Sequence, residues 1–193
     1  MKKDIIIAGV GGQGIISIAS AIGFASIEAG LFFKQNEVHG MSQRGGEVVS
    51  HFRISDRPIF SDLIPEGEAD LIISMEPLET LRYVNFLSPD GWIIANNNPF
   101  VNMPNYPDKN LILENLENFK NSIILNADEI ARKLGNSKAT NMVLLGAASP
   151  FIGIDFEILK NSIRTIFARK GDKVIDLNIQ AMEKGREFAL QKV

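Results

Sequence analysis

The chain has 193 residues, of which 45% are hydrophobic and 22% charged, and its formal net charge is −3. That length and balance are typical of one globular domain with its own core, so we predict a single domain over residues 1–193. The acidic balance argues against non-specific nucleic-acid binding, which needs a surplus of Lys and Arg. The sequence contains no cysteine, which leaves this chain alone without thiol nucleophiles, disulfides or Cys-bound zinc or iron–sulfur clusters.

Membrane attachment is not expected either. No apolar run approaches the roughly 18 residues that would span a bilayer. The N-terminal sequence MKKDIIIAGVGGQG has no long apolar region followed by a small-residue cleavage site, as a secretory signal would have. We therefore expect a cytoplasmic protein that binds neither membrane nor nucleic acid.

The first part of the sequence predicts a strand, a glycine turn and a helix, followed by more strands. Residues 4–8 form a β-branched run typical of a strand buried on both faces. Apolar and small residues at helical spacing predict a helix over 15–29, and a second strand is expected over 31–38. Alternation over 48–54, with a turn and a return over 59–64, predicts an antiparallel hairpin.

The rest of the sequence alternates strands with helices and then becomes helical. Residues 97–110 contain three prolines and are too long for a simple connection, so we predict a lid or contact loop there, with exposed apolar Phe100, Val101 and Tyr106 facing a partner. The fold class is therefore α/β: a three-layer, mostly parallel (mixed) Rossmann-like sheet with an inserted antiparallel hairpin and a helical C-terminal third. The remaining expected strands are 70–74, 92–96 and 122–126, and the expected helices are 77–87, 114–120, 127–134, 142–148, 155–168 and 173–190.

A glycine-rich turn is the first candidate binding site. The sequence GVGGQG at residues 9–14 matches the dinucleotide fingerprint G-x-G-x-x-G between a strand and a helix. Without Cβ atoms, such a turn lets an anion approach backbone N–H groups at the positive end of the helix. The candidate binding residues here are Gly9, Gly11, Gly12, Gln13 and Gly14.

The remainder of that fingerprint is missing. A ribose-binding acid should follow about 20 residues after the turn, but Glu28 lies inside the predicted helix and Glu37 comes late. The glycines therefore either bind a ligand or serve strand-to-helix packing, or the turn receives a partner's carboxylate. Gln13 favours a ligand slightly, because its amide can donate to a phosphate or carbonyl oxygen and a pure packing turn would not need it.

A second loop combines one guanidinium with flexible residues near the expected strand ends. Arg44 could clamp a phosphate or carboxylate at two points, and its neighbours could add donors; the alternative is a surface arginine in a salt bridge. His39, just before this loop, is an acid–base candidate but is better interpreted as hydrogen-bonded to backbone, and His51 is expected to face outward. We assign no catalytic residue and no metal ligand. The candidate binding residues of the second loop are Ser42, Gln43, Arg44, Gly45 and Gly46.

Two of these motifs together resemble a known family. GVGGQGI at 9–15 and EVHGMSQRGGEVVSHFRIS at 37–55 are similar to the γ-type subunits of 2-oxoacid:ferredoxin oxidoreductases (the pyruvate/ketoisovalerate oxidoreductase γ-type domain), most of all to the β subunit of indolepyruvate ferredoxin oxidoreductases. The strand after the second loop carries an arginine, Arg53, as in that family. ADEIARKLGN at 127–136, Asn141, Leu145-Gly146 and a terminal helix with Asn178, Ala181 and Gly185 agree, although Lys138-Ala139-Thr140 and 97–110 depart from the family pattern.

The resemblance implies a division of labour between subunits. A partner α subunit would carry thiamine diphosphate, Mg²⁺ and the [4Fe–4S] clusters that reduce ferredoxin, and coenzyme A would be a co-substrate. The complex would oxidatively decarboxylate indolepyruvate or other aryl-2-oxoacids to acyl-CoA. This chain would hold no cofactor alone, would be inactive alone, and would shape and close the site. Its glycine loops would contact coenzyme A or the thiamine-binding partner, and the isolated chain is a candidate homodimer.

Two other functions stay open from the residues. One is a free-standing Rossmann-like protein that binds NAD, FAD or ADP at the turn over 9–14. The other is a purely structural interaction module whose loops serve packing and contacts only.

Overall fold

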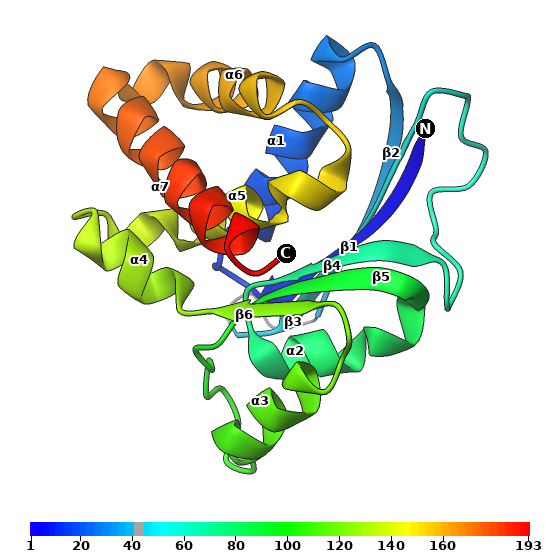
Figure 1. Ribbon diagram of the computed structural model, residues 1–193, viewed down its shortest axis with the longest axis vertical. Coiled ribbons are helices and arrows are strands. Elements are labelled where there is room, and N and C mark those ends of the chain that lie inside the picture. The colour runs from blue at the N-terminus through cyan, green and yellow to red at the C-terminus, as the bar shows by residue number, and fades with distance from the viewer. Residues whose placement is uncertain (41–44) are drawn as a thin grey trace.

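The core of the protein is a six-stranded mixed sheet with strand order β2-β3-β1-β4-β5-β6, seen edge-on in the computed structural model of Figure 1. The structure describes residues 1–40 and 45–193. β1, β4, β5 and β6 are parallel to one another, whereas β3 is antiparallel to both of its neighbours, β1 and β2. The strands are β1 (Lys2–Val10), β2 (Phe32–His39), β3 (Glu47–Ser55), β4 (Ala69–Ser74), β5 (Leu87–Asn96) and β6 (Ser122–Leu125).

Helices cover both faces of the sheet, so the expected three layers and helical C-terminal part are confirmed (Figure 1). Alternate residues of β1 divide between two cores: Ile5 and Ile7 pack under the larger helical layer, whereas Ile6 and Ala8 pack under the smaller one. The larger layer contains α1 (Ile15–Glu28), α4 (Ala127–Lys133), α5 (Thr140–Ile152), α6 (Phe156–Phe167) and α7 (Asp172–Leu190), and the smaller contains α2 (Pro77–Arg82) and α3 (Lys109–Glu117).

The antiparallel hairpin is present, but its partner strand differs from our prediction. β3 pairs with β2 along its whole length on one side, from Phe32 opposite Ser55 to His39 opposite Val48, and with β1 on the other side. Both hydrogen-bonding edges of β3 are therefore occupied. The expected return strand over 59–64 is wrong, because no edge of β3 is left for it to pair with.

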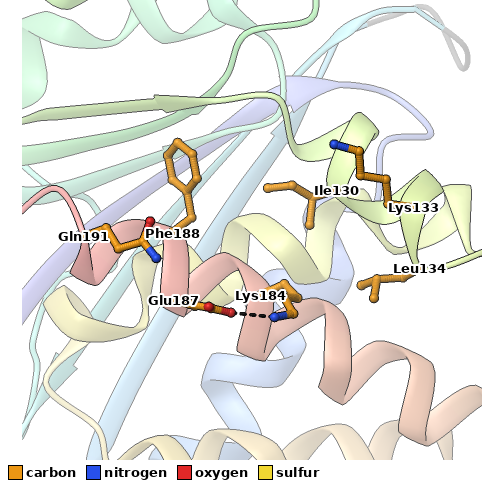
Figure 2. Close-up of a pocket in the computed structure, with 7 residues that line it drawn as sticks. All are labelled: Ile130, Lys133, Leu134, Lys184, Glu187, Phe188 and Gln191. Atoms are coloured by element: carbon orange, nitrogen blue, oxygen red, sulfur yellow. Dashed lines mark hydrogen bonds and ion pairs between the residues drawn. The ribbon is translucent and has the colours of Figure 1, made fainter.

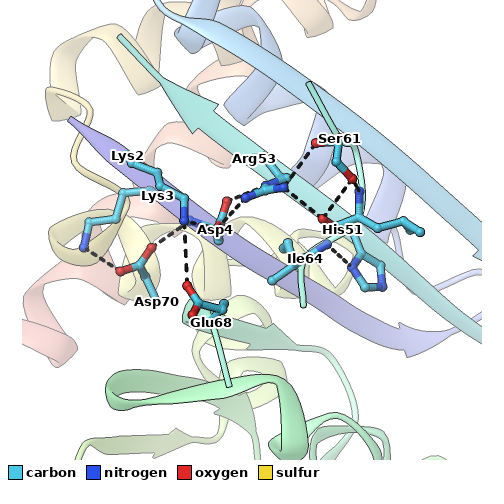
Figure 3. A network of polar contacts seen from close by, with 10 residues as sticks. Lys2, Lys3, Asp4, His51, Arg53, Ser61, Ile64, Glu68 and Asp70 are labelled. Atoms are coloured by element: carbon cyan, nitrogen blue, oxygen red, sulfur yellow. Dashed lines mark hydrogen bonds and ion pairs between the residues drawn. The ribbon is translucent and has the colours of Figure 1, made fainter. Parts of the chain in front are cut away.

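Residues 59–64 are instead fixed in place by hydrogen bonds to side chains of β3. Arg53 of β3 donates to the carbonyl oxygen of Ser61 at 3.2 Å, as Figure 3 shows, and to that of Leu63 at 2.9 Å. The backbone N–H of Ile64 donates to Nδ1 of His51 at 3.2 Å. His51 is only 8% exposed, so our expectation that it faces outward is wrong; burial lowers the pKa of His51 and favours the neutral ring that can accept this bond.

Two helices begin or end elsewhere than predicted, for local reasons. α2 ends at Arg82 rather than 87 because the chain tightens into a 3₁₀ turn at Val84–Phe86 and then enters β5. α3 begins at Lys109, several residues before the expected 114, because the carboxylate of Asp108 accepts hydrogen bonds from Asn110 N and Leu111 N and caps the helix.

The buried helix α5 connects the larger helical layer to the sheet. Nearly all of its residues are buried, and it crosses α7 so closely that a Cβ on Gly146 would lie 1.9 Å from Met182 O, and one on Gly185 1.9 Å from Val143 O. Glycine at both positions lets the two backbones touch. Within the described ranges, no helix is both long and apolar enough to cross a membrane.

Candidate functional site

The glycine turn lies at the point where the crossover helices change from one face of the sheet to the other. From the carboxyl end of β1 the chain passes through α1, in the larger helical layer, to β2; from the carboxyl end of β4 it passes through α2, in the smaller layer, to β5 (Figure 1). In open α/β sheets a crevice forms outside the strand ends at such a switch point, and ligands bind there. The predicted site and the fold therefore point to the same edge of the sheet.

The turn itself is held closed by its glutamine. Val10 N donates to Gln13 Oε1 at 2.8 Å, and Gly14, with φ 88°, forms the N-cap of α1. The expectation that a packing turn would not need Gln13 is thus wrong, because its carbonyl oxygen closes the turn. At Gly12, with φ 97°, no atom of the described residues, apart from its own chain neighbours, lies within 4 Å of the place a Cβ would take. The backbone of Gly12 is therefore open to an approaching group.

The two glycine loops lie side by side. Gly11 N donates to Gly46 O at 2.8 Å, and Gly40 N donates to Glu47 O at 2.8 Å, so the second loop leaves β2 and enters β3 directly beside the turn. Gly45 has φ 79° and its carbonyl accepts from Asn102. The other candidate residues of this loop, Ser42, Gln43 and Arg44, lie outside the described residues.

A cleft of about 870 Å³ opens at this edge. Its walls come from the glycine turn with the start of α1, the ends of β4 and β5, the segment after β5, the start of α4, residues 135–138, the start of α5, and the turn before α7 with the first half of that helix. The lining includes Gly12, Gln13, Gly14, Ser17, Met75, Asn96, Asn98, Pro99, Phe100, Asp128, Gly135, Asn136, Ser137, Lys138, Thr140, Asn141, Phe167, Lys170, Val174, Leu177 and Asn178. A volume of this size suits a cofactor-sized ligand.

One wall of the cleft is a hydrogen-bonded network around Asp128. Asn96 Nδ2 donates to Asp128 Oδ2 at 2.8 Å, and Thr140 Oγ1 donates to Asp128 Oδ1 at 2.9 Å. The carbonyl oxygen of the Asn96 side chain accepts from Ala127 N at 3.1 Å. The ends of β5, α4 and α5 are thereby locked together, and Asp128 is satisfied by neutral donors.

Amide side chains from α5 and α7 face the same space. Asn141 Nδ2 donates to Gly14 O at 3.3 Å, and a Cβ on Gly14 would lie 2.5 Å from that nitrogen. Asn178, from α7, donates to Val174 O at 2.7 Å. These two asparagines belong to the segments that agreed with the family pattern, and the fold brings them to one cleft although they are 37 residues apart.

Positive charge in the cleft comes from two lysines that our sequence interpretation did not assign. Lys138 follows α4 and Lys170 precedes α7, and both line the cleft. Neither is in an ion pair with another described residue, although the ammonium of Lys170 lies 5.1 Å from the ring centre of Phe167. Together with the open backbone at Gly12, they favour an anionic ligand.

In the smaller helical layer, α2 carries a buried glutamate with an unusual pKa. Burial raises the pKa of Glu79 to about 7 from an ordinary 4.5. Arg82, whose Nε lies 3.1 Å from Glu79 Oε1, opposes that shift, whereas Glu76 and Glu47 add to it. At neutral pH, Glu79 is therefore close to half protonated.

A second hollow, of about 350 Å³, lies between α4 and α7 (Figure 2). Ile130, Leu134 and Phe188 make it apolar. Both of the lysines that line it are paired, Lys184 with Glu187 at 2.7 Å and Lys133 with Glu129 at 2.8 Å. None of the described residues that line it is a glycine. We therefore take the cleft at the strand ends as the candidate site.

The donor set of the cleft suits a phosphorylated organic ligand better than a metal ion. Its one carboxylate, Asp128, is already bound by Asn96 and Thr140. Among the described residues, no three His, Asp or Glu side chains gather as metal ligands would. The open glycine backbone and the two lysines are instead the groups that bind phosphates.

Sequence reasoning found the glycine turn but missed most of the cleft. Asn96, Asp128 and Lys170 come from distant segments, and only the fold brings them together. A usable signal was present: polar residues, Asn96 to Asn98 and Asn126, directly follow two buried strands, and the carboxyl ends of parallel strands meet at one edge.

Comparison with known proteins gives a consistent result. The family described as "Pyruvate ferredoxin/flavodoxin oxidoreductase" matches residues 4–188. The "Indolepyruvate oxidoreductase subunit IorB" of Pyrococcus horikoshii is 36% identical over 200 residues, which cover 98% of this chain and 97% of that protein.

Two solved structures share the fold. The γ subunit of a keto/oxoacid ferredoxin oxidoreductase from Geobacter sulfurreducens has a TM-score of 0.70 at 23% identity and covers 98% of this chain and 99% of that one. The 2-oxoglutarate:ferredoxin oxidoreductase of Magnetococcus marinus, solved with 2-oxoglutarate, coenzyme A and succinyl-CoA bound, has a TM-score of 0.78 at 22% identity. It covers 98% of this chain, which spans only 31% of that longer chain.

Proposed function

This chain belongs to the pyruvate ferredoxin/flavodoxin oxidoreductase family, and we propose that it is a required subunit of a 2-oxoacid:ferredoxin oxidoreductase that carries no redox cofactor itself. The observation that carries the proposal is the full-length similarity to an indolepyruvate oxidoreductase subunit, combined with a cleft that suits a phosphorylated ligand. The complex would contain a partner α subunit with thiamine diphosphate, Mg²⁺ and [4Fe–4S] clusters.

The residues of this chain support placing the redox groups on the partner. With no cysteine in the sequence, it cannot supply the thiolates that bind [4Fe–4S] clusters. Thiamine diphosphate requires a bound Mg²⁺, but among the described residues that line the cleft the only carboxylate, Asp128, is engaged with two side chains. The role left to this chain is to bind and orient a substrate that has no need of a metal.

We propose coenzyme A as the ligand of the cleft. The turn at Gly12 would receive a phosphate of coenzyme A on its N–H groups, and Lys138 and Lys170 would neutralise its charge. The amides of Asn141 and Asn178 are placed to bind the polar parts of the ligand. The thiol that coenzyme A supplies takes up the acyl group after decarboxylation.

The overall reaction balances with two substrates, the 2-oxoacid and coenzyme A, and two one-electron acceptors. A 2-oxoacid, coenzyme A and two oxidised ferredoxins give acyl-CoA, CO₂, two reduced ferredoxins and a proton. The carbon–carboxylate bond breaks, a thioester bond forms, and the electron pair leaves through the clusters of the partner. In this reaction, the residues of this chain hold coenzyme A and exclude water around it.

The cleft is tested by titrating coenzyme A into the purified chain in a calorimeter. We expect saturable binding that Gly12→Ala weakens at least tenfold, because a methyl group would occupy the open approach to the backbone and would strain the turn at φ 97°. Lys138→Ala and Lys170→Ala should each weaken binding as well. Lys133→Ala is the control, since Lys133 lies outside the cleft and is paired with Glu129. Binding unchanged by all three cleft variants would exclude this site.

Indolepyruvate, or another aryl-2-oxoacid, is the substrate we propose for the complex. The support is the 36% identity to an indolepyruvate oxidoreductase subunit, which exceeds the 29% identity to a 2-oxoglutarate synthase subunit, KorC of Methanothermobacter marburgensis. The test is the ratio of kcat/KM for indolepyruvate, 2-oxoglutarate and pyruvate in the reconstituted complex. A preference for 2-oxoglutarate would contradict this assignment without affecting the subunit role.

A free-standing NAD- or FAD-binding protein is not favoured by the geometry. In the dinucleotide fold the second strand lies beside the first and ends in the acid that binds ribose. Here β3 separates β2 from β1, so Glu37 of β2 is one strand further from the glycine turn. A melting shift of several degrees with NAD, FAD or ADP, and none with coenzyme A, would restore that alternative.

A further inference from the structure

The segment of residues 97–108, which we call the strap, connects β5 to α3 (Figure 1). Its residues Asn98, Pro99 and Phe100 line the cleft. The strap contains no helix or strand, and most of its residues are exposed. Phe100 lines the cleft although it is 45% exposed. The strap therefore has no core of its own and depends on a few specific contacts for its position.

Glu76, at the end of β4, supplies the main contacts. Its side chain is only 1% exposed, and one oxygen, Oε1, accepts from Phe100 N at 3.3 Å and from the hydroxyl of Tyr106. The other oxygen, Oε2, accepts from Glu79 N at 2.8 Å and caps α2. One buried carboxylate thus joins the rigid edge of the sheet to both halves of the strap.

A further contact connects the strap to the second glycine loop. Asn102 Nδ2 donates to Gly45 O at 2.6 Å. The strap therefore contacts the cleft through Phe100, the sheet through Glu76 and the second loop through Asn102. Its position decides how open the cleft is on that side.

Tyr106 is less exposed than we expected, and its hydroxyl has a partner within the chain. We predicted an exposed residue waiting for a partner, but its hydroxyl is bound within the chain by Glu76 and its ring is partly buried. Burial and the adjacent Glu76 carboxylate raise the pKa of Tyr106, so the hydroxyl keeps its proton and remains a donor. A charge-assisted bond of this kind is stronger than a neutral one.

We propose that the Tyr106–Glu76 hydrogen bond is the latch that holds the strap closed over the cleft, and that both are positioning residues for the ligand. The inference rests on the proposed function for the identity of the ligand, coenzyme A. Breaking the latch releases the strap and opens the cleft, while the sheet below stays folded. Ligand entry and release are then governed by strap opening.

The test uses the absence of cysteine in the chain. Met75 lines the cleft, is 3% exposed and directly precedes Glu76, so Met75→Cys introduces a single thiol whose reaction with a water-soluble disulfide reagent reports cleft opening. In this background, Tyr106→Phe should raise the labelling rate about tenfold, since about 1.4 kcal/mol of charge-assisted hydrogen bond corresponds to that factor. The matched control is Tyr83→Phe, the same change at the only other tyrosine, which lies outside the strap and should leave the rate within about twofold.

Experiments with coenzyme A test the latch separately from the proposal that coenzyme A is the ligand of the cleft. Saturating coenzyme A should slow labelling of the Met75→Cys thiol, and Tyr106→Phe should raise the Kd of coenzyme A about fivefold or more. Faster labelling in Tyr106→Phe without any effect of coenzyme A would support the latch and contradict the coenzyme A site. Equal labelling rates in Tyr106→Phe and Tyr83→Phe, with both variants folded by circular dichroism, would overturn the latch whether or not coenzyme A binds.

Discussion

The guanidinium of Arg53 makes two hydrogen bonds to the carboxylate of Asp4, at 2.8 and 3.0 Å, across the antiparallel pair of β3 and β1 (Figure 3). Asp4 is completely buried. The same guanidinium donates to two carbonyls of the segment over 59–64. This ion pair therefore joins the antiparallel strand to the parallel part of the sheet and holds the loop that covers it.

Removing Arg53 should be costly, because a buried carboxylate then loses its main partner. We expect Arg53→Ala to lower the free energy of unfolding by about 3–5 kcal/mol, measured by urea denaturation. The control is Lys2→Ala, since Lys2 is an exposed partner of the same carboxylate at 2.9 Å and should contribute less than about 1 kcal/mol. Equal losses in the two variants would show that the Arg53 pair has no special role.

The crossing of α5 and α7 should tolerate no side chain at its closest point. Gly146→Ala would place Cβ within 1.9 Å of Met182 O, and the two backbones would have to separate. We expect a loss of at least about 2–3 kcal/mol in urea unfolding. Gly185→Ala should behave in the same way.

A third helical glycine provides the matched control for that crossing. At Gly23 in α1, the nearest atoms to a Cβ are ring carbons of Phe33 at 3.5 Å, an ordinary contact. Gly23→Ala should therefore be neutral or stabilise the protein by about 0.5 kcal/mol through helix propensity. If Gly146→Ala proved as mild as Gly23→Ala, the close approach of the two helices would be disproved.

Glu79 should make stability depend on pH near neutrality. Its pKa is about 7 in the folded protein and an ordinary 4.5 when the group is unperturbed, so the folded state holds the proton more tightly. The free energy of unfolding should therefore fall as pH rises from 4.5 through 7, by at most about 3 kcal/mol. Denaturation at pH 5, 6, 7 and 8 measures the slope.

Glu79→Gln should remove that part of the slope, because the neutral amide does not titrate. Glu129→Gln is the control: Lys133 lowers the pKa of the exposed Glu129, so that carboxylate stays ionised across the window and its replacement should leave the slope unchanged. A Glu79→Gln variant with the slope of the wild-type protein would mean that Glu79 does not carry this pH dependence.

The elements that depend on local sequence signals could be predicted, whereas the pairing between distant strands could not. The buried run at 4–8, the glycine turn and the terminal helices were predicted because spacing and turn residues over a few positions determine them. The partner of β3 was not, since the alternation over 48–54 fits any neighbour equally well. Only the long-range pairing of β1 with β3, such as Ile5 opposite Phe52, decides it.

The same distinction applies to the site. The first glycine turn was predicted from one hexapeptide, and the structure brings it beside Gly46 of the second loop. Lys170 and Asp128 carry no local signature, because an isolated lysine or aspartate is usually a surface residue. Their role as cleft walls follows only from the way α4 and α7 return to the carboxyl edge of the sheet.

The central claim, that this chain works only as part of a larger oxidoreductase, is tested most directly by reconstitution. The purified chain and its thiamine diphosphate and iron–sulfur partner are assayed separately and together for ferredoxin reduction that depends on indolepyruvate and coenzyme A. We predict no turnover by this chain alone and recovery of activity when the partner is added. Sustained 2-oxoacid oxidation by this chain alone, or a partner whose rate is unaffected by its addition, would contradict the account.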